Sequence, residues 1–201
     1  MPLRPLARRL SLAAVACLLP TVAFAHGGHG DGGGLAQGFA HPIAGLDHIL
    51  AMVTVGIFAW QMGGRALWLV PASFVGIMAV GGALGVAGVE VPLVELGIAL
   101  SVIVLGAVVA AGVEAPPALA MGLVGFFAVF HGHAHGAEMP QDASAFGYGA
   151  GFMAATALLH LGGIGLGFAV GKAGEKYGAL VVRAAGGLIA LGGLGLLGGA
   201  L

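Results

Sequence analysis

The sequence is dominated by long apolar runs that contain almost no charged side chains. Residues 66–87 contain no Asp, Glu, Lys or Arg, and residues 91–113 contain only Glu95. An α-helix of about 20 apolar residues crosses the hydrocarbon core of a bilayer. Charged residues make up 7% of the chain, against about 25% in a soluble domain, so the folded surface must face lipid. The sequence therefore predicts an all-α membrane protein.

Six such runs predict a polytopic bundle of six transmembrane helices in residues 41–201. Glycine supplies 40 of the 201 residues, which suits this architecture because small residues let membrane helices pack closely. Pro42 and Pro116 stand in the first turn of two runs, where proline is tolerated. The predicted helices cover residues 42–62, 66–87, 91–113, 116–133, 146–170 and 179–201.

The first 25 residues have the layout of a secretory signal peptide. A basic start precedes an apolar run at residues 10–19, and a small-x-small cleavage site ends at Ala25. We expect cleavage there, which leaves residues 26–40 as a His/Gly-rich periplasmic tail; an uncleaved first helix is the alternative. Cleavage also removes Cys17, the only cysteine, and with it any disulfide or thiolate metal site.

The basic residues predict the orientation of the bundle. Signal cleavage places the mature N-terminus in the periplasm, so six spans put the loops at 63–65 and 172–177 in the cytoplasm. Basic residues favour cytoplasmic loops. We expect a multi-pass protein of the bacterial inner membrane, with the lipid bilayer as a partner, no affinity for nucleic acid, and self-association left open. The basic residues that follow the signal peptide all lie in or near those two loops: Arg65, Lys172, Lys176 and Arg183.

The first predicted helix begins with two histidines and a carboxylate. If residues 42–62 form one helix, His41 and His48 lie two turns apart on nearly one face, and Met52 lies one turn beyond His48. Asp47 points to the adjoining face. An ionised carboxylate inside a bilayer needs a partner, and a cation would serve. The alternative is a salt bridge from Asp47 to a histidine that holds two helices together.

A second group of histidines ends the fourth predicted helix. His131 and His135 share one face if the helix continues, and Glu138 lies one turn further on. Two histidines at this spacing can hold one metal ion, and His-rich tracts often bind metal. His133 lies between them in the sequence. The alternative is a hydrated loop whose imidazoles only titrate.

The remaining histidines lie in the tail and deep in the fifth helix. His26 and His29 belong to the predicted tail, where they could collect an ion. His160 lies deep and shares a helical stripe with Thr156; a lone buried histidine can equally be a structural residue. Imidazole and carboxylate ligands without thiolate suit nickel, cobalt, zinc or copper(II). Glu95 also lies within a span and needs a partner.

Three segments, residues 41–56, 130–138 and 151–160, resemble the motifs of the HupE/UreJ family in order and spacing. The resemblance covers nearly the whole mature chain. It implies a nickel, sometimes cobalt, permease that serves the maturation of hydrogenase or urease, with Ni²⁺ as the transported substrate and Co²⁺ or Zn²⁺ as alternatives. It implies no organic cofactor. Matched by motif, the functional positions are His41, Asp47, His48, His131, His135, Glu138 and His160, whereas His133 lies outside the motif positions.

The residues and the resemblance together predict import of a divalent metal ion and no enzymatic activity. The outer histidines would collect the ion, the site around Asp47 would bind it, and His160 with Thr156 would receive it further in. One alternative is an intramembrane metal-dependent hydrolase in which Asp47 or Glu138 acts as the base. Another is a metal sensor or structural subunit that binds metal without flux.

Overall fold

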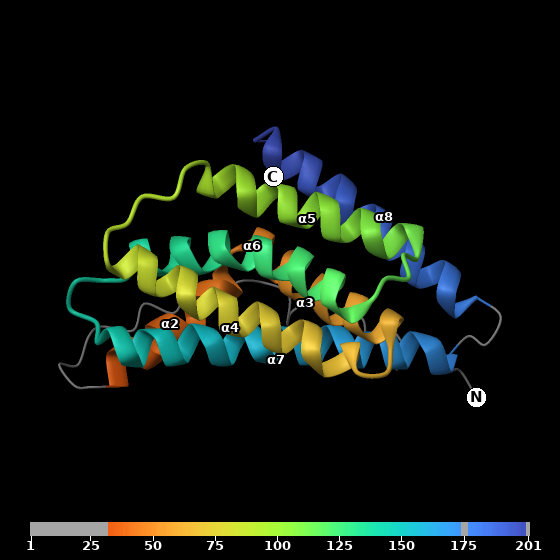
Figure 1. Cartoon of the computed structure of the whole chain (residues 1–201), viewed down its shortest axis with the longest axis horizontal. Coiled ribbons are helices and arrows are strands. Elements are labelled where there is room, and N and C mark those ends of the chain that lie inside the picture. Colours follow the sequence, from red (N-terminus) through yellow and green to blue (C-terminus); the bar gives the residue numbers. More distant parts are fainter. Residues whose placement is uncertain (1–31, 174–176, 200–201) are drawn as a thin grey trace, which may run out of the picture.

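The computed structural model describes residues 32–173 and 177–199, and within these the chain forms α-helices and no strands. The predicted all-α class is confirmed. The expected signal peptide, His26 and His29 lie outside the described residues. The helices are α2 (Gly32–Ala44), α3 (Leu46–Met62), α4 (Ala66–Val86), α5 (Val94–Ala111), α6 (Pro117–Ala137), α7 (Ala145–Ala173) and α8 (Gly178–Leu197) (Figure 1).

The helices α4 to α8 are each long and apolar enough to cross a membrane. The pair α2 and α3 passes the same test only together, because the two axes meet at 84°. Counted as one broken span, this pair completes the six predicted crossings. Most bounds lie within a few residues of the prediction; α6 continues to Ala137 instead of ending near His133.

The prediction of one straight helix over residues 42–62 is wrong. The helix breaks at Gly45, whose extended backbone (φ −93°, ψ 122°) separates α2 from α3. Pro42 consequently lies inside α2 and does not open a helix. Residues 32–40, which we assigned to the tail, form most of α2. His41 and His48 therefore lie on two helices and not on one face of a single helix.

The helices pack in pairs around α3, which lies inside the bundle (Figure 1). α4 packs on α6, α5 on α8, and α7 on both α2 and α3. Glycines allow these close crossings: a Cβ at Gly56 in α3 would collide with the carbonyl oxygen of His160 in α7. This close approach brings His160 directly beside α3.

The two ends of the bundle differ in chemistry. One end, which we call the histidine end, holds α2, the start of α3, and the connections from α4 to α5 and from α6 to α7, at the left of Figure 1. The opposite end holds the turn at Arg65. Arg183 in α8 donates a hydrogen bond from Nη2 to the carbonyl oxygen of Ala111, the last residue of α5 (2.9 Å), so both arginines lie away from the histidine end.

Candidate metal site

Two imidazoles on α6 form the centre of the site. Because α6 stays helical to Ala137, His131 and His135 lie one turn apart on one face. Both side chains point into the bundle and are fully buried. The hydrated-loop alternative therefore does not hold for these two residues.

His48, in the first turn of α3, meets both of them. Its ring centroid lies 4.8 Å from that of His131 and 4.6 Å from that of His135. The residue is 9% exposed. We call His48, His131 and His135 the imidazole cluster. Two separate helices thus bring together three metal-ligating side chains that the sequence placed in two motifs.

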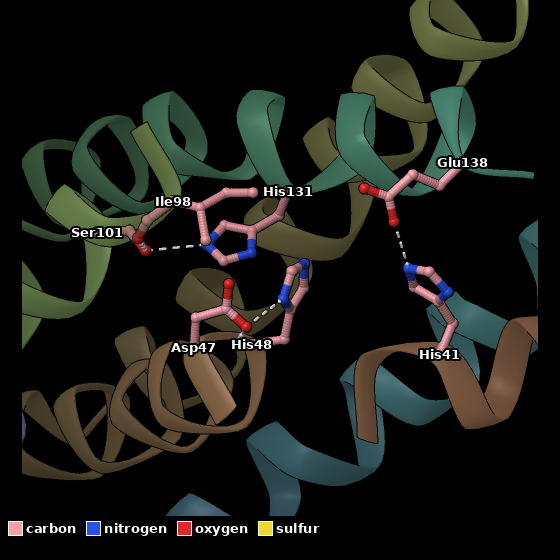
Figure 2. A network of polar contacts seen from close by, with 7 residues as sticks. All are labelled: His41, Asp47, His48, Ile98, Ser101, His131 and Glu138. Carbon is pink, nitrogen blue, oxygen red and sulfur yellow. Dashed lines mark hydrogen bonds and ion pairs between the residues drawn. The ribbon is translucent and has the colours of Figure 1, made fainter. Parts of the chain in front are cut away.

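Asp47 determines which nitrogen of His48 is free. Its Oδ1 accepts a hydrogen bond from the backbone N–H of His48 (2.7 Å) and lies 2.8 Å from His48 Nδ1 (Figure 2). A carboxylate accepts only, so Nδ1 carries the proton. His48 Nε2 keeps its lone pair and is buried without a hydrogen-bond partner among the described residues. This carboxylate–imidazole pair is the arrangement that orients histidine ligands in metal sites, and it lies within α3, so it is not a bridge between helices.

Ser101 on α5 determines which ring nitrogen of His131 is free. Its hydroxyl donates its single proton to the carbonyl oxygen of Ile98 (2.6 Å). The contact of 2.9 Å between Ser101 Oγ and His131 Nε2 must then be donated by the imidazole. His131 Nδ1 is left with its lone pair, buried and without a hydrogen-bond partner in the part of the chain that the structure describes. The two fixed tautomers therefore present one bare nitrogen each (Figure 2).

His135 completes the imidazole cluster, and both of its ring nitrogens are buried with no hydrogen-bond partner within residues 32–173 and 177–199. Its ring stacks on Phe152, with centroids 5.0 Å apart. Buried polar atoms in native proteins almost always have partners, so several bare nitrogens in one place make the imidazole cluster a candidate cation site. Among residues 32–173 and 177–199, however, no three His, Cys, Asp or Glu side chains stand where one ion touches them all. One ion would touch all three imidazoles only if the rings moved closer together.

An ion pair joins α2 to the end of α6 beside the imidazole cluster. His41 Nε2 lies 2.9 Å from Glu138 Oε2, and both side chains are partly exposed (Figure 2). The His41 ring contacts that of His135 edge-on, with centroids 4.9 Å apart. Tyr148 packs against the other side of His41, at 6.0 Å. The pair thus lies between solvent and the buried imidazoles.

His160 lies deeper, behind an aromatic ring. Phe74 on α4 has its centroid 5.7 Å from that of His131 and 5.2 Å from that of His160. Both nitrogens of His160 are buried, and neither has a hydrogen-bond partner among the residues that the structure describes. One turn away, the hydroxyl of Thr156 donates to the sulfur of Met78 (3.6 Å). A polar path past the imidazole cluster would therefore have to pass Phe74.

The structure separates His133 from the imidazole cluster. Its Nε2 donates to the carbonyl oxygen of Val89 in the connection from α4 to α5 (2.8 Å), and its Nδ1 has no partner. The half turn that separates it from His131 directs it to another side of α6. It belongs to the histidine end of the bundle but has no ring contact with the cluster.

Asp47 is also reached from a groove between α3, α5 and α8. The groove has a volume of about 330 Å³ and is lined by Asp47, Glu95, Leu96, Ala99, Leu196 and Leu197. Glu95 is exposed in it. The two carboxylates that the sequence placed in different spans thus share one opening at the histidine end.

Sequence reasoning missed three residues of this region. Ser101 was an unremarked hydroxyl in an apolar run, and its only signal was its polarity. Phe74 and Tyr148 carried no signal, because aromatic side chains in membrane helices are usually packing residues. Their positions follow from the packing of α4, α5 and α7 around α6.

The sequence matches the protein family described as HupE / UreJ protein over residues 13–196. It is 52% identical over 189 residues to the Protein HupE of Rhizobium leguminosarum bv. viciae, which covers 93% of this chain and 95% of that protein. No solved structure matches it. The chain therefore belongs to the HupE/UreJ family, a family of membrane transporters associated with nickel and cobalt and not of enzymes.

Proposed function

We propose that the protein is a permease that carries Ni²⁺ from the periplasm into the cytoplasm, where the ion serves the maturation of hydrogenase or urease. The observation that carries this proposal is the imidazole cluster, in which bare nitrogens of His48, His131 and His135 are buried side by side. Neutral imidazole is a good ligand for nickel. The neighbouring carboxylates of Asp47 and Glu138 offset the charge of a divalent ion.

Binding begins at the partly exposed groups. The groove beside Asp47 and the His41–Glu138 pair are the two polar approaches to the cluster. An arriving ion competes for the carboxylate of Glu138 and exchanges water for imidazole. A small shift of the His48 and His131 rings, with their hydrogen bonds to Asp47 and Ser101 kept, then brings their bare nitrogens toward one point. The second oxygen of Asp47, which faces the His131 ring in Figure 2, adds a charged ligand.

Release proceeds toward the opposite end. His160 supplies the next unpartnered imidazole, beyond the ring of Phe74. Displacement of this ring opens the way between the two polar regions. His26 and His29, outside the described residues, would collect the ion ahead of the cluster. His133 would contribute to that collection and not to the cluster.

Membership of a transporter family rules out the hydrolase alternative. The sensor alternative differs from the permease in one measurable way, since it predicts metal binding without flux. Sealed vesicles that contain the purified protein separate the two.

The decisive experiment measures uptake of radioactive nickel into such vesicles. Asp47→Ala and His135→Ala should each lower the initial rate to that of empty vesicles, because one removes the carboxylate that orients His48 and the other removes an imidazole of the cluster. His133→Ala is the matched control on the same helix and should keep a rate close to that of the unmodified protein at saturating nickel. Equal rates for His135→Ala and the unmodified protein would disprove the proposed site.

The same vesicles determine the substrate. Excess Co²⁺ or Zn²⁺ added outside should compete with nickel in proportion to its affinity for the cluster. We expect nickel to be preferred over zinc. A substrate preference for zinc would contradict nickel as the physiological cargo.

A further inference from the structure

The break between α2 and α3 occurs at a glycine whose backbone does not need to be glycine. Gly45 has φ −93° and ψ 122°, an extended conformation open to any L-residue. The reason for a glycine here must therefore lie in the surroundings of the missing side chain.

Those surroundings are the carboxylate–imidazole pair itself. A Cβ at Gly45 would lie 2.7 Å from Asp47 Oδ1 and 3.0 Å from His48 Nδ1. These are the two atoms that contact each other at 2.8 Å. A methyl group would therefore meet the carboxylate at a distance that real Cβ atoms do not show, and the carboxylate would have to move.

The glycines where α3 crosses α7 act differently from Gly45. At Gly56 and Gly163, an added Cβ would collide with backbone atoms of the facing helix, so these positions set how closely α3 and α7 approach. At Gly45 the three nearest atoms all belong to the side chains of Asp47 and His48. The residue therefore controls side-chain positions and not helix packing.

We propose that Gly45 is a positioning residue of the cation site. Its missing side chain lets Asp47 fold back onto His48, which fixes the proton on Nδ1 and leaves Nε2 free beside His131 and His135. This inference rests on the proposed transport function. Loss of the partner that orients a histidine ligand typically lowers metal affinity by about 10- to 100-fold, and we expect that range for Gly45→Ala.

The test is a double-mutant cycle on the full-length protein in detergent. Nickel affinity is measured by titration for the unmodified protein, Gly45→Ala, Asp47→Ala and the double variant, and Co²⁺ absorption reports the ligand geometry. Gly162→Ala is the matched control, because a Cβ there meets nothing within 4 Å. Thermal unfolding is followed for every variant.

The expected result is non-additive. Gly45→Ala should weaken nickel binding by about 10- to 100-fold and alter the Co²⁺ spectrum, whereas Gly162→Ala changes neither. In the Asp47→Ala background the same methyl should cause no further loss, because no carboxylate remains for it to displace.

Two outcomes would overturn the inference while the proposed function stands. In the first, Asp47→Ala binds nickel weakly but Gly45→Ala keeps the affinity of the unmodified protein. In the second, Gly45→Ala lowers nickel affinity equally in the unmodified protein and in Asp47→Ala. The second would mean a general structural defect. If Asp47→Ala itself transported nickel at the normal rate, the proposed site would fail instead.

Discussion

The Ser101 hydroxyl determines how a buried imidazole can act as a ligand. A hydroxyl has one proton, and Ser101 gives it to its own helix at Ile98. The oxygen can then only accept from His131 Nε2. As a result, the nitrogen nearer the protein backbone, Nδ1, is the one offered to an ion. Asp47 instead holds the proton of His48 on Nδ1 and leaves Nε2 free. The two rings therefore present different nitrogens to the same space.

Ser101→Ala tests this role. The substitution leaves His131 Nε2 buried without a partner and removes the preference for one tautomer, so nickel affinity should fall by about 10- to 100-fold. Titration of the purified protein with nickel measures the change. Ser73→Ala is the control, since Ser73 also donates to the carbonyl three residues earlier, at Val70, and has no hydrogen bond to a histidine of the described residues. Equal affinities in the two variants would show that the tautomer does not matter.

At the level of single residues, helical spacing predicted part of the site. The spacing of His131 and His135 placed them on one face, and the structure buries both there. The spacing placed Asp47 on the face adjoining that of His48, and it could not show that the carboxylate folds back onto this adjacent residue. Ser101 could not be assigned, because its role depends on which helix faces α5, and nothing in the local sequence specifies that.

At the level of helices, the broken span is the feature that periodicity could not predict. Glycine is common within membrane helices, so Gly45 did not mark a boundary. Pro42 was assigned to a first turn because proline favours that position, yet it lies within α2. The break depends on α2 packing against α7, which is a contact between distant parts of the chain. In other transporters, broken helices also occur where ions bind.

The contact between α5 and α8 offers a stability test away from the imidazole cluster. A Cβ at Gly186 would lie 2.7 Å from Ala110 N and 2.8 Å from the carbonyl oxygen of Gly106, whereas one at Gly187 would meet nothing within 4 Å. Gly186→Ala should therefore destabilise the bundle by about 1–3 kcal/mol through overpacking. Gly187→Ala should be neutral or slightly stabilising.

Thermal unfolding in detergent compares these two adjacent substitutions directly. A lower melting temperature for Gly186→Ala alone is the expected result. The same stability in both variants would mean that α5 and α8 do not cross as closely as the structure places them. Because α5 carries Ser101 and Glu95, Gly186→Ala should also reduce nickel uptake.

At the level of the whole molecule, the two ends of the bundle differ in chemistry, and the proposed function depends on this asymmetry. The imidazoles, Asp47 and Glu138 lie at the histidine end, and Arg65 and Arg183 lie away from it. The composition predicted the membrane bundle, because so few charged residues cannot coat a soluble protein. It did not predict where the polar residues meet, since that requires α3 inside the bundle and α6 beside it.

This asymmetry predicts that the membrane potential drives nickel inward. Each positive charge that crosses gains about 2.3 kcal/mol per 100 mV, so a divalent ion gains about 4.6 kcal/mol, or about three decades of accumulation. Vesicles with a potassium gradient and valinomycin provide an inside-negative potential, and radioactive nickel reports the concentration ratio at steady state. The ratio should rise steeply with the potential and fall to unity when potassium is equal on both sides.

A pH gradient without a potential is the informative control for this experiment. If nickel moves alone, the pH gradient should produce no accumulation, and Glu95→Gln should leave the dependence on potential unchanged even where it slows uptake. If nickel accumulation instead follows the pH gradient and does not depend on the membrane potential, the protein exchanges nickel for protons. The carboxylates and imidazoles at the histidine end would then carry protons outward in place of the ion, and the independence from a counter-ion predicted here would be wrong.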